Sequence, residues 1–378
     1  MSIIPHSLLF IIMPVGMLMV IFILLRSVPA LWQLTVGAED NRRNHTMDGV
    51  RGLLSLWVLT HHLLVISTPA ALPLKPLAPS GAVEMLMGSS FFTAPFYALT
   101  GMLFGGALLV SGGKLNTWQF LRRRLFRLLP VYILSIGMVI FFAFYMTSFK
   151  LNISLFKMAK EIGRWSSFGF LKMYDINSAP VASWHGMLWT LPFEICFYLA
   201  LPVFAFAQRK LRTPAILVIG LLAMGAFNWQ FLFFATGVVA AAALSWRHRW
   251  NSVVWTVLSI AALFGLGLTA SLRSPALQAV LLIPILVAAA KQIRLFFLFR
   301  GKPIRFIGEI SYSIYILHFP ILSITFDIFI NREHFSSLEM PVRLALLCVI
   351  GVMIICLSAT SYVFVERPLI ALSRRGRS

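Results

Sequence analysis

The stretch MDGVRGLLSLWVLTHHLLVI (residues 47–66) is apolar enough to span a membrane, yet it carries an arginine and a histidine on one helical face. Arg51 and His62 are eleven residues apart, which on a helix is three turns plus about 20° of rotation and about 16 Å of rise. We expect Arg51 at one membrane face and His62 near the bilayer midplane, with Ser55 on the stripe between them. An ionisable side chain at that depth is costly and indicates a function, and histidine is suited to proton transfer near neutral pH. The structural alternative is that His62 bonds a neighbouring helix.

The composition is that of a membrane protein. Of the 378 residues, 59% are hydrophobic and only 12% are charged, and the mean hydropathy is +0.87. A soluble chain of this length could not bury so much apolar surface, and the apolar residues come in runs of spanning length. Lipid admits only helices or closed barrels, and the alternating pattern of barrel strands is not found here. We predict an all-α fold, a polytopic bundle of membrane helices.

The apolar runs predict about eleven transmembrane helices. They fall at about 7–25, 50–68, 86–110, 128–147, 187–207, 214–229, 230–246, 252–271, 275–290, 311–330 and 341–365. The first run lacks the basic start and small-residue exit of a signal peptide, so we interpret it as an anchor. This divides the chain into an extra N-terminal helix with a cytoplasmic linker (1–46) and a main membrane domain (47–378).

The net charge of +20 reflects topology rather than nucleic-acid binding. Most of the 32 Lys and Arg residues lie in short loops between apolar runs, and no compact basic domain is present to grip a duplex. The positive-inside rule then predicts an external N-terminus and a cytoplasmic C-terminus. The longest loop, 148–186, lies outside and alternates basic with aromatic residues, a pattern of an interfacial amphipathic helix or of a lid.

Three cysteines, Cys196, Cys348 and Cys356, lie inside apolar runs without a CxxC pattern, so neither a metal site nor a disulfide framework is expected.

A second polar feature, after the Arg51–His62 helix, is Glu194 in the segment LWTLPFEICFY (188–198). It lies about two turns, or roughly 10 Å, below the non-cytoplasmic face of the membrane. A lone carboxylate there must be paired, protonated or in a water-filled cavity.

A third feature is the basic run RRRLFRLLP (122–130) at the cytoplasmic mouth of the fourth span. Arg124 and Arg127, at positions i and i+3, face one ligand together, with Arg123 beside them. Guanidinium forks match phosphate oxygens well, but judged by charge alone, ordinary anchoring by the positive-inside rule is the favoured explanation of such a run. A fourth feature is the segment FIGEISYSIYILH (306–318), where Ser311, Tyr315 and His318 share a face. They form either a polar cavity wall or bonds between helices.

Together these segments resemble the motifs of the family-3 membrane acyltransferases, integral O-acyltransferases of about ten helices that commonly modify bacterial surface glycans. The resemblance runs from about Met47 to Pro368. The matching segments, in the family's order, are DGVR (48–51) with His62, FYALTG (96–101), RRLFRLLP (123–130), LWTL…E…FY (188–198), IGEISYSIYILH (307–318) and VERP (365–368). Thr100 replaces the usual serine, the run at 7–25 precedes the family's first helix, and the chain stops ten residues past Pro368 without the esterase-like domain of many relatives. Acceptor transfer is therefore expected in the membrane domain or on a separate protein.

The resemblance implies acyl transfer, most simply of acetyl, from acyl-CoA on the cytoplasmic side to a hydroxyl of a surface or exported glycan. In that mechanism His62 is a general base or a covalent relay, Glu194 orients His62 or the acceptor, and Arg51 stands behind the donor site. Donor phosphates are assigned to Arg123, Arg124 and Arg127, and the pantetheine path to Ser311, Tyr315 and His318. No permanently bound cofactor and no metal is expected.

The resemblance also implies the bacterial inner membrane as the location, and contact with lipid-linked glycan and envelope polysaccharide machinery. Two alternatives remain open at this point. One is a transporter or flippase of a lipid-linked glycan, which requires neither acyl-CoA nor an essential histidine. The other is a catalytically inactive subunit of a secretion complex, against which the intact Arg51–His62 spacing argues.

Overall fold

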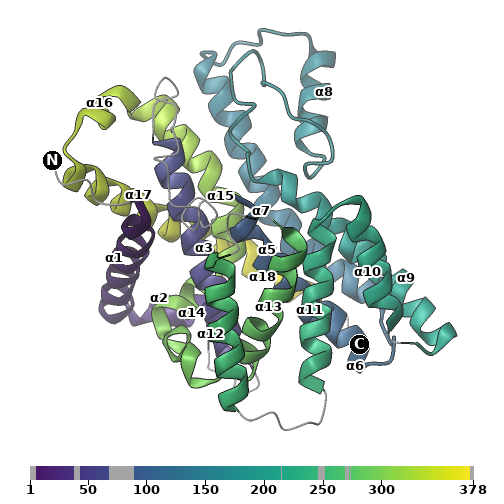
Figure 1. Ribbon diagram of the computed structural model, residues 1–378. Helices are drawn as coiled ribbons and strands as arrows, with labels where there is room; N and C mark the ends of the chain where they lie inside the picture. The colour runs from purple at the N-terminus through teal and green to yellow at the C-terminus, as the bar shows by residue number, and fades with distance from the viewer. Residues whose placement is uncertain are drawn as a thin grey trace.

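A computed structural model describes residues 6–37, 43–67, 89–213, 215–245, 252–268, 272 and 274–374, and over these residues the chain folds as helices joined by loops (Figure 1). The all-α prediction is confirmed, and each predicted apolar run is helical where it is described. Parts of the N-terminal segment 1–46, and one end each of the runs 50–68, 86–110, 214–229, 230–246 and 252–271, lie outside the described residues.

Six helical segments of the described chain are long and apolar enough to cross a membrane, or up to eight if each of two bent pairs is one span. Four of the six are built from more than one helix. The six are α3 (His45–Ile66), α5–η1–α6 (Ser89–Thr100, Gly101–Gly105, Gly106–Val110), α7 (Thr117–Met146), η2–α9 (Leu188–Thr190, Leu191–Leu211), α15–η5 (Ser311–Ile324, Thr325–Phe329) and α17–η6–α18 (Met340–Ser361, Tyr362–Glu366, Arg367–Arg374).

The remaining apolar runs form bent pairs or shorter helices. The bent pairs are α1 (His6–Ser27) with α2 (Pro29–Thr35), at 101°, and α13 (Pro275–Ala290) with the 3₁₀ segment η4 (Arg294–Arg300), at 70°. The shorter apolar helices are α10 (Ala215–Phe227), α11 (Gln230–Ser245) and α12 (Ser252–Leu268). Short helices outside the apolar runs are α8 (Leu155–Trp165), α14 (Lys302–Glu309) and α16 (Arg332–Ser337).

Helix α7 begins eleven residues before the predicted span at 128–147. Asn116 caps it, its side chain accepting a hydrogen bond from the backbone N–H of Gln119 at 3.0 Å. Arginine is a good helix former, so the basic run continues the helix rather than ending it. The arginines of 122–127 therefore lie on the helix itself, within its first three turns, and not in a loop at its mouth.

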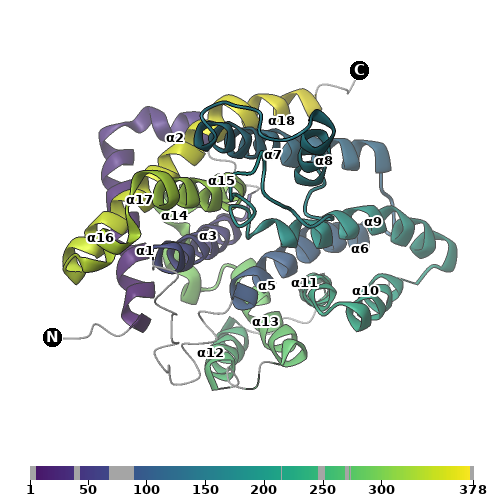
Figure 2. The ribbon, with the colours of Figure 1, turned by 90° about the horizontal axis from the view of Figure 1, so that it is seen from above.

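The two larger hydrophobic cores of the described residues lie between helices. Seen from above in Figure 2, the helices around them form two neighbouring groups. The first core lies among α1, α3, α7, α15 and α17, and the second among α5, α9, α10, α11 and α13. Helix α3 contributes to both, since Leu59 and Leu63 belong to the first core and Leu54 to the second. The N-terminal helix α1 belongs to the first core, because one of its faces, Met13, Met17 and Ile21, is fully buried against α3 and α17.

Loop 148–186 is folded onto the C-terminal half of α7. Its helix α8 is amphipathic, with Leu155 and Phe156 exposed and Trp165 fully buried. The Tyr132 hydroxyl on α7 donates to the Trp165 carbonyl at 2.7 Å and accepts from the Phe168 N–H at 2.8 Å. These bonds fix the loop against the bundle, so the exposed face of α8 is held in a defined place.

Glycines bring α3 into backbone contact with η4 and α14. A Cβ atom on Gly49 would lie 1.8 Å from the Phe299 carbonyl oxygen, and one on Gly52 would lie 2.2 Å from the Ile304 carbonyl oxygen. From the other helix, a Cβ on Gly308 would lie 1.9 Å from the Asp48 carbonyl oxygen. Small residues that allow helices to approach closely are a recurring device of membrane interfaces. A side chain at Gly49 would push α3 away from η4, and one at Gly52 or Gly308 would push α3 and α14 apart.

We predict that Gly52→Ala lowers the melting temperature of the purified protein, with a loss of roughly 1–3 kcal/mol, because the added methyl group meets backbone and not a movable side chain. Gly137→Ala is the matched control, since a Cβ there has nothing within 4 Å. That helical substitution should leave stability unchanged or raise it by about 0.4–1 kcal/mol. Thermal unfolding in detergent measures both, and equal melting temperatures would contradict the proposed close contact.

Candidate functional site

A cavity of about 210 Å³ lies where the two cores meet. Its walls come from α3, α5 with η1, α7, η2 with α9, and α15. Aromatic and aliphatic side chains make up part of the lining, and the rest is polar. The charged and hydrogen-bonding side chains of the lining are Arg51, Thr93, Tyr97, Thr100, Arg124, Arg127, Thr190, Glu194, Tyr198, Ser311, Tyr312 and Tyr315.

Two of the cavity arginines have unused hydrogen-bonding capacity. Arg51 projects from α3 and Arg127 from α7, and their like charges interact unfavourably. Among the described residues, neither guanidinium group has a hydrogen-bond partner or an ion pair. Each guanidinium carries five N–H donors, so an anion bound between them would satisfy donors and reduce the repulsion.

Arg124 is held by aromatic rings. Its guanidinium carbon lies 4.4 Å from the centroid of the Phe104 ring and 5.9 Å from that of Tyr198. Both distances are within the range of cation–π attraction. The rings fix the plane of the guanidinium while the group remains part of the cavity wall. Arg124 is thus a positioned cation, less free to reorient than Arg127.

Glu194 shares the cavity with these arginines. It lies in the first turn of α9 and accepts a short hydrogen bond from the Tyr198 hydroxyl, one turn further along the same helix. The same tyrosine ring faces Arg124, so Tyr198 links the carboxylate to the cation. With three arginines and one glutamate in its walls, the cavity has an excess of positive charge, which favours anionic ligands.

His62 pairs with a second histidine. The His62 ring is buried, and its Nδ1 lies 3.1 Å from Nε2 of His318 on α15. His318 is fully buried, and its Nδ1 lies 2.8 Å from the Ile314 carbonyl oxygen. The Phe319 ring packs against the His62 ring, with 5.1 Å between the two ring centroids. Neither histidine belongs to the cavity lining.

Tyr315 connects the cavity with the histidine pair. It lines the cavity, and its ring centroid lies 6.2 Å from that of His318. Its hydroxyl and that of Thr190 are hydrogen-bonded at 2.6 Å, which joins α15 to η2 just before α9.

The structure brings most of the residues singled out from the sequence to one place. Those that line the cavity are Arg51, Arg124, Arg127, Glu194, Ser311 and Tyr315. Arg123 lies outside the lining on α7, and His62 and His318 lie behind Tyr315. The stripe expected from Arg51 through Ser55 is interrupted, because Ser55 is buried and donates to the Arg51 carbonyl at 2.8 Å. Glu194 bonds Tyr198 and not His62.

Comparison with known protein families gives a match that covers most of the chain. Residues 44–361 match the family-3 acyltransferase model, described as an acyltransferase domain. The chain belongs to acyltransferase family 3. Comparisons with curated proteins and with solved structures gave no match. Family membership implies that the protein transfers an acyl group from a donor to an acceptor. The long apolar helices indicate that it does so as a multi-pass membrane protein.

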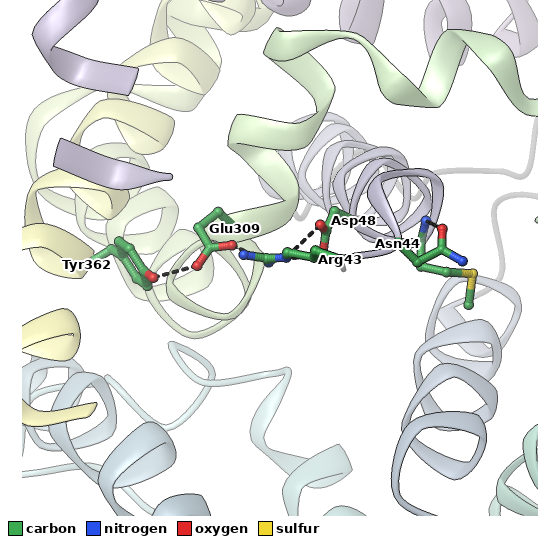
Figure 3. A network of polar contacts seen from close by, with 6 residues as sticks. Arg43, Asn44, Asp48, Glu309 and Tyr362 are labelled. Carbon is green, nitrogen blue, oxygen red and sulfur yellow. Dashed lines mark hydrogen bonds and ion pairs between the residues drawn. The ribbon is translucent and has the colours of Figure 1, made fainter. Parts of the chain in front are cut away.

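In this acyltransferase the start of α3 is fixed by an ionic network (Figure 3). The Arg43 Nε lies 2.7 Å from an Asp48 carboxylate oxygen, and Arg43 also forms an ion pair with Glu309. The Tyr362 hydroxyl donates to Glu309 at 2.6 Å. Burial would raise the pKa of Glu309, but Arg43 and the Tyr362 hydroxyl hold that pKa below its usual value. The carboxylate therefore stays ionised and keeps α3, α14 and η6 together near the cavity.

Asn44 completes this anchoring of α3. Its side-chain oxygen caps the helix by accepting from the Met47 N–H at 3.3 Å, and its amide nitrogen donates to the Ala290 carbonyl at 2.8 Å. The cap thus also ties α3 to the end of α13. These contacts fix the rotation and depth of the helix that carries Arg51 and His62.

Several residues of the acyltransferase site were not assigned a role from the sequence. Tyr198 had a local signal, because Glu194 and Tyr198 at i and i+4 share a helical face. Arg43 had none, since it precedes the matched motifs and finds Glu309 only through tertiary packing. The contact of Phe104 with Arg124 likewise joins two helices that no spacing relates.

Proposed function

We propose that this acyltransferase moves an acyl group, most simply acetyl, from acyl-CoA to a hydroxyl group of a cell-surface or exported glycan. The observation that carries the proposal is the positively charged cavity one side chain away from a buried histidine pair. Acyl-CoA carries phosphates and a thioester in one molecule. The guanidinium groups of the cavity can bind the phosphates, and the thioester can then reach the imidazole of His62.

The donor site is formed by the cavity arginines. Arg127 and Arg51, whose guanidinium groups have no partner among the described residues, would hold the CoA phosphates, with Arg124 beside them. Arg–phosphate bonds are charge-assisted and often bidentate. Ser311 and Tyr315, along one face of α15, would line the pantetheine arm as it runs toward the histidines. Arg123 lies outside this path.

The transfer step uses His62. As a general base, His62 takes the proton of the acceptor hydroxyl while that oxygen attacks the thioester carbonyl carbon. The C–O bond forms, the C–S bond of the tetrahedral intermediate breaks, and the proton on His62 passes to the leaving CoA sulfur. In the relay variant, His62 Nε2 attacks the thioester carbonyl carbon, the C–S bond breaks and CoA leaves as the thiolate. The acceptor hydroxyl oxygen then attacks the acyl-imidazolium, the acyl–nitrogen bond breaks, and the hydroxyl proton passes to the CoA thiolate. Both routes require Tyr315 to move aside. Glu194, bonded to Tyr198, would act on the donor side of the cavity.

We predict that Arg127→Ala weakens acetyl-CoA binding by roughly 10- to 100-fold, the effect of losing a hydrogen bond to a charged group. Arg124→Ala should weaken binding less, because Phe104 and Tyr198 already hold its guanidinium. Isothermal titration of the purified protein measures both. Arg123→Ala is the matched control: it removes the same charge from the same helix outside the cavity. If all three variants bound acetyl-CoA as tightly as the wild-type protein, the arginine run would serve only to orient the helix in the membrane.

We predict that His62→Ala lowers glycan acylation by roughly 10²–10⁴-fold, the contribution of a general base, while acetyl-CoA affinity stays within about twofold of wild type. His61→Ala is the control, since His61 is the neighbouring ring on the same helix. The assay follows CoA release and acyl-glycan formation by purified protein. Near-wild-type acylation by His62→Ala would contradict the proposed mechanism. Glycan movement without CoA release would favour the transporter alternative.

We also propose that all eleven apolar segments cross a bacterial inner membrane, with the N-terminus outside and the C-terminus in the cytoplasm, where acyl-CoA is available. Cysteines placed at the exposed positions Asn152 and Lys291, in a background without the three native cysteines, test this orientation. An impermeant maleimide should label position 152 in intact cells, and position 291 only after the membrane is broken. The reverse pattern would invert the orientation and place the arginines outside.

A further inference from the structure

The hydrogen bonds of His318 determine which of its nitrogens carries a proton. His318 Nδ1 lies 2.8 Å from the Ile314 carbonyl oxygen, one turn earlier on α15. A carbonyl oxygen only accepts, so Nδ1 of His318 must carry the hydrogen. In a neutral imidazole the other nitrogen, Nε2, then has the lone pair and acts as an acceptor.

The acceptor nitrogen of His318 faces His62. His318 Nε2 lies 3.1 Å from His62 Nδ1, so Nδ1 of His62 must be the donor. A neutral imidazole carries only one N–H, so His62 Nε2 is left with the lone pair.

We propose that His318 is a positioning residue that holds His62 in the tautomer with a free Nε2, the nitrogen that acts in acyl transfer. The inference rests on the proposed role of His62, and it applies both to the base and to the relay, because each uses the Nε2 lone pair. His318 thus acts through His62 and touches neither donor nor acceptor. This replaces the role on the pantetheine path that the sequence suggested for it.

The pair also responds to the charge that forms during transfer. When His62 Nε2 takes the proton of the acceptor hydroxyl, the ring becomes an imidazolium whose Nδ1–H still donates to His318. A hydrogen bond from a charged donor is stronger than one from a neutral donor, so the stabilisation grows as the reaction proceeds. Interactions that strengthen only in the charged state accelerate the chemical step rather than binding.

The choice of histidine for this position follows from its surroundings. His318 is fully buried within the first core, among Leu317, Ile321 and Leu322. A carboxylate would orient His62 equally well, as in Ser-His-Asp triads, but an ionised group is costly at such a depth. A neutral imidazole accepts the same hydrogen bond without a permanent buried charge.

The test compares His318→Gln with His318→Leu. Glutamine places an amide oxygen where the His318 Nε2 was and still accepts from His62, whereas leucine cannot. We expect kcat to fall by at least ~10²-fold in His318→Leu and to remain within about tenfold of wild type in His318→Gln. KM for acetyl-CoA should be unchanged in both, since His318 lies outside the cavity. Equal losses in the two variants, or full activity of His318→Leu, would overturn the proposal.

A spectroscopic measurement tests the tautomer independently of activity and of the His318 variants. In the wild-type protein labelled with ¹⁵N-histidine, the His62 resonance is identified among the eight histidines by its loss in His62→Ala. Its chemical shifts should report a protonated Nδ1 and a bare Nε2. A protonated Nε2 in the wild type would overturn the role of His318 even if His62 proves essential. Retained acylation by His62→Ala would instead refute the proposed function.

Discussion

The backbone contact between α3 and α14 is the constraint on which the site depends. Gly52 and Gly308 leave no room for a side chain between the two helices. Contact at this distance fixes both the rotation of α3 about its axis and its position along it. The fixed rotation turns Arg51 into the cavity and, three turns later, His62 onto α15. The ionic network at Arg43 and the cap at Asn44 secure the same end of the helix.

Buried charge is distributed unequally in this protein. The carboxylates near the site are hydrogen-bonded or ion-paired: Glu309 with Arg43 and Tyr362, Glu194 with Tyr198, and Glu366 with Ser313. The cavity guanidinium groups of Arg51 and Arg127, by contrast, have no such partners among the described residues. A partly buried cation without a partner is costly unless a ligand compensates it, so the cost of this arrangement points to an anionic substrate.

Much of the architecture follows from the sequence because lipid leaves few choices. Long apolar runs must be helices, and the predicted runs and the observed helices agree where the chain is described. The boundaries were less predictable. The start of α7 depends on a cap at Asn116, and the 101° turn into α2 was missed because residues after the first apolar run looked like a linker. Local spacing grouped Arg124 with Arg127, and both line the cavity. It also grouped Ser311 and Tyr315 with His318, of which only the first two line it. It could not reveal the pairing of His62 with His318, which are 256 positions apart.

The central claim is that one donor molecule joins the arginine cavity to His62. The most direct test is an experimental structure with a non-reactive acyl-CoA, in which a methylene group replaces the thioester sulfur. The account predicts the phosphates against Arg51, Arg124 and Arg127, a displaced Tyr315, and the carbonyl carbon of the analogue next to His62 Nε2. An analogue bound outside the cavity, or one whose carbonyl stays on the arginine side of an unmoved Tyr315, would contradict it.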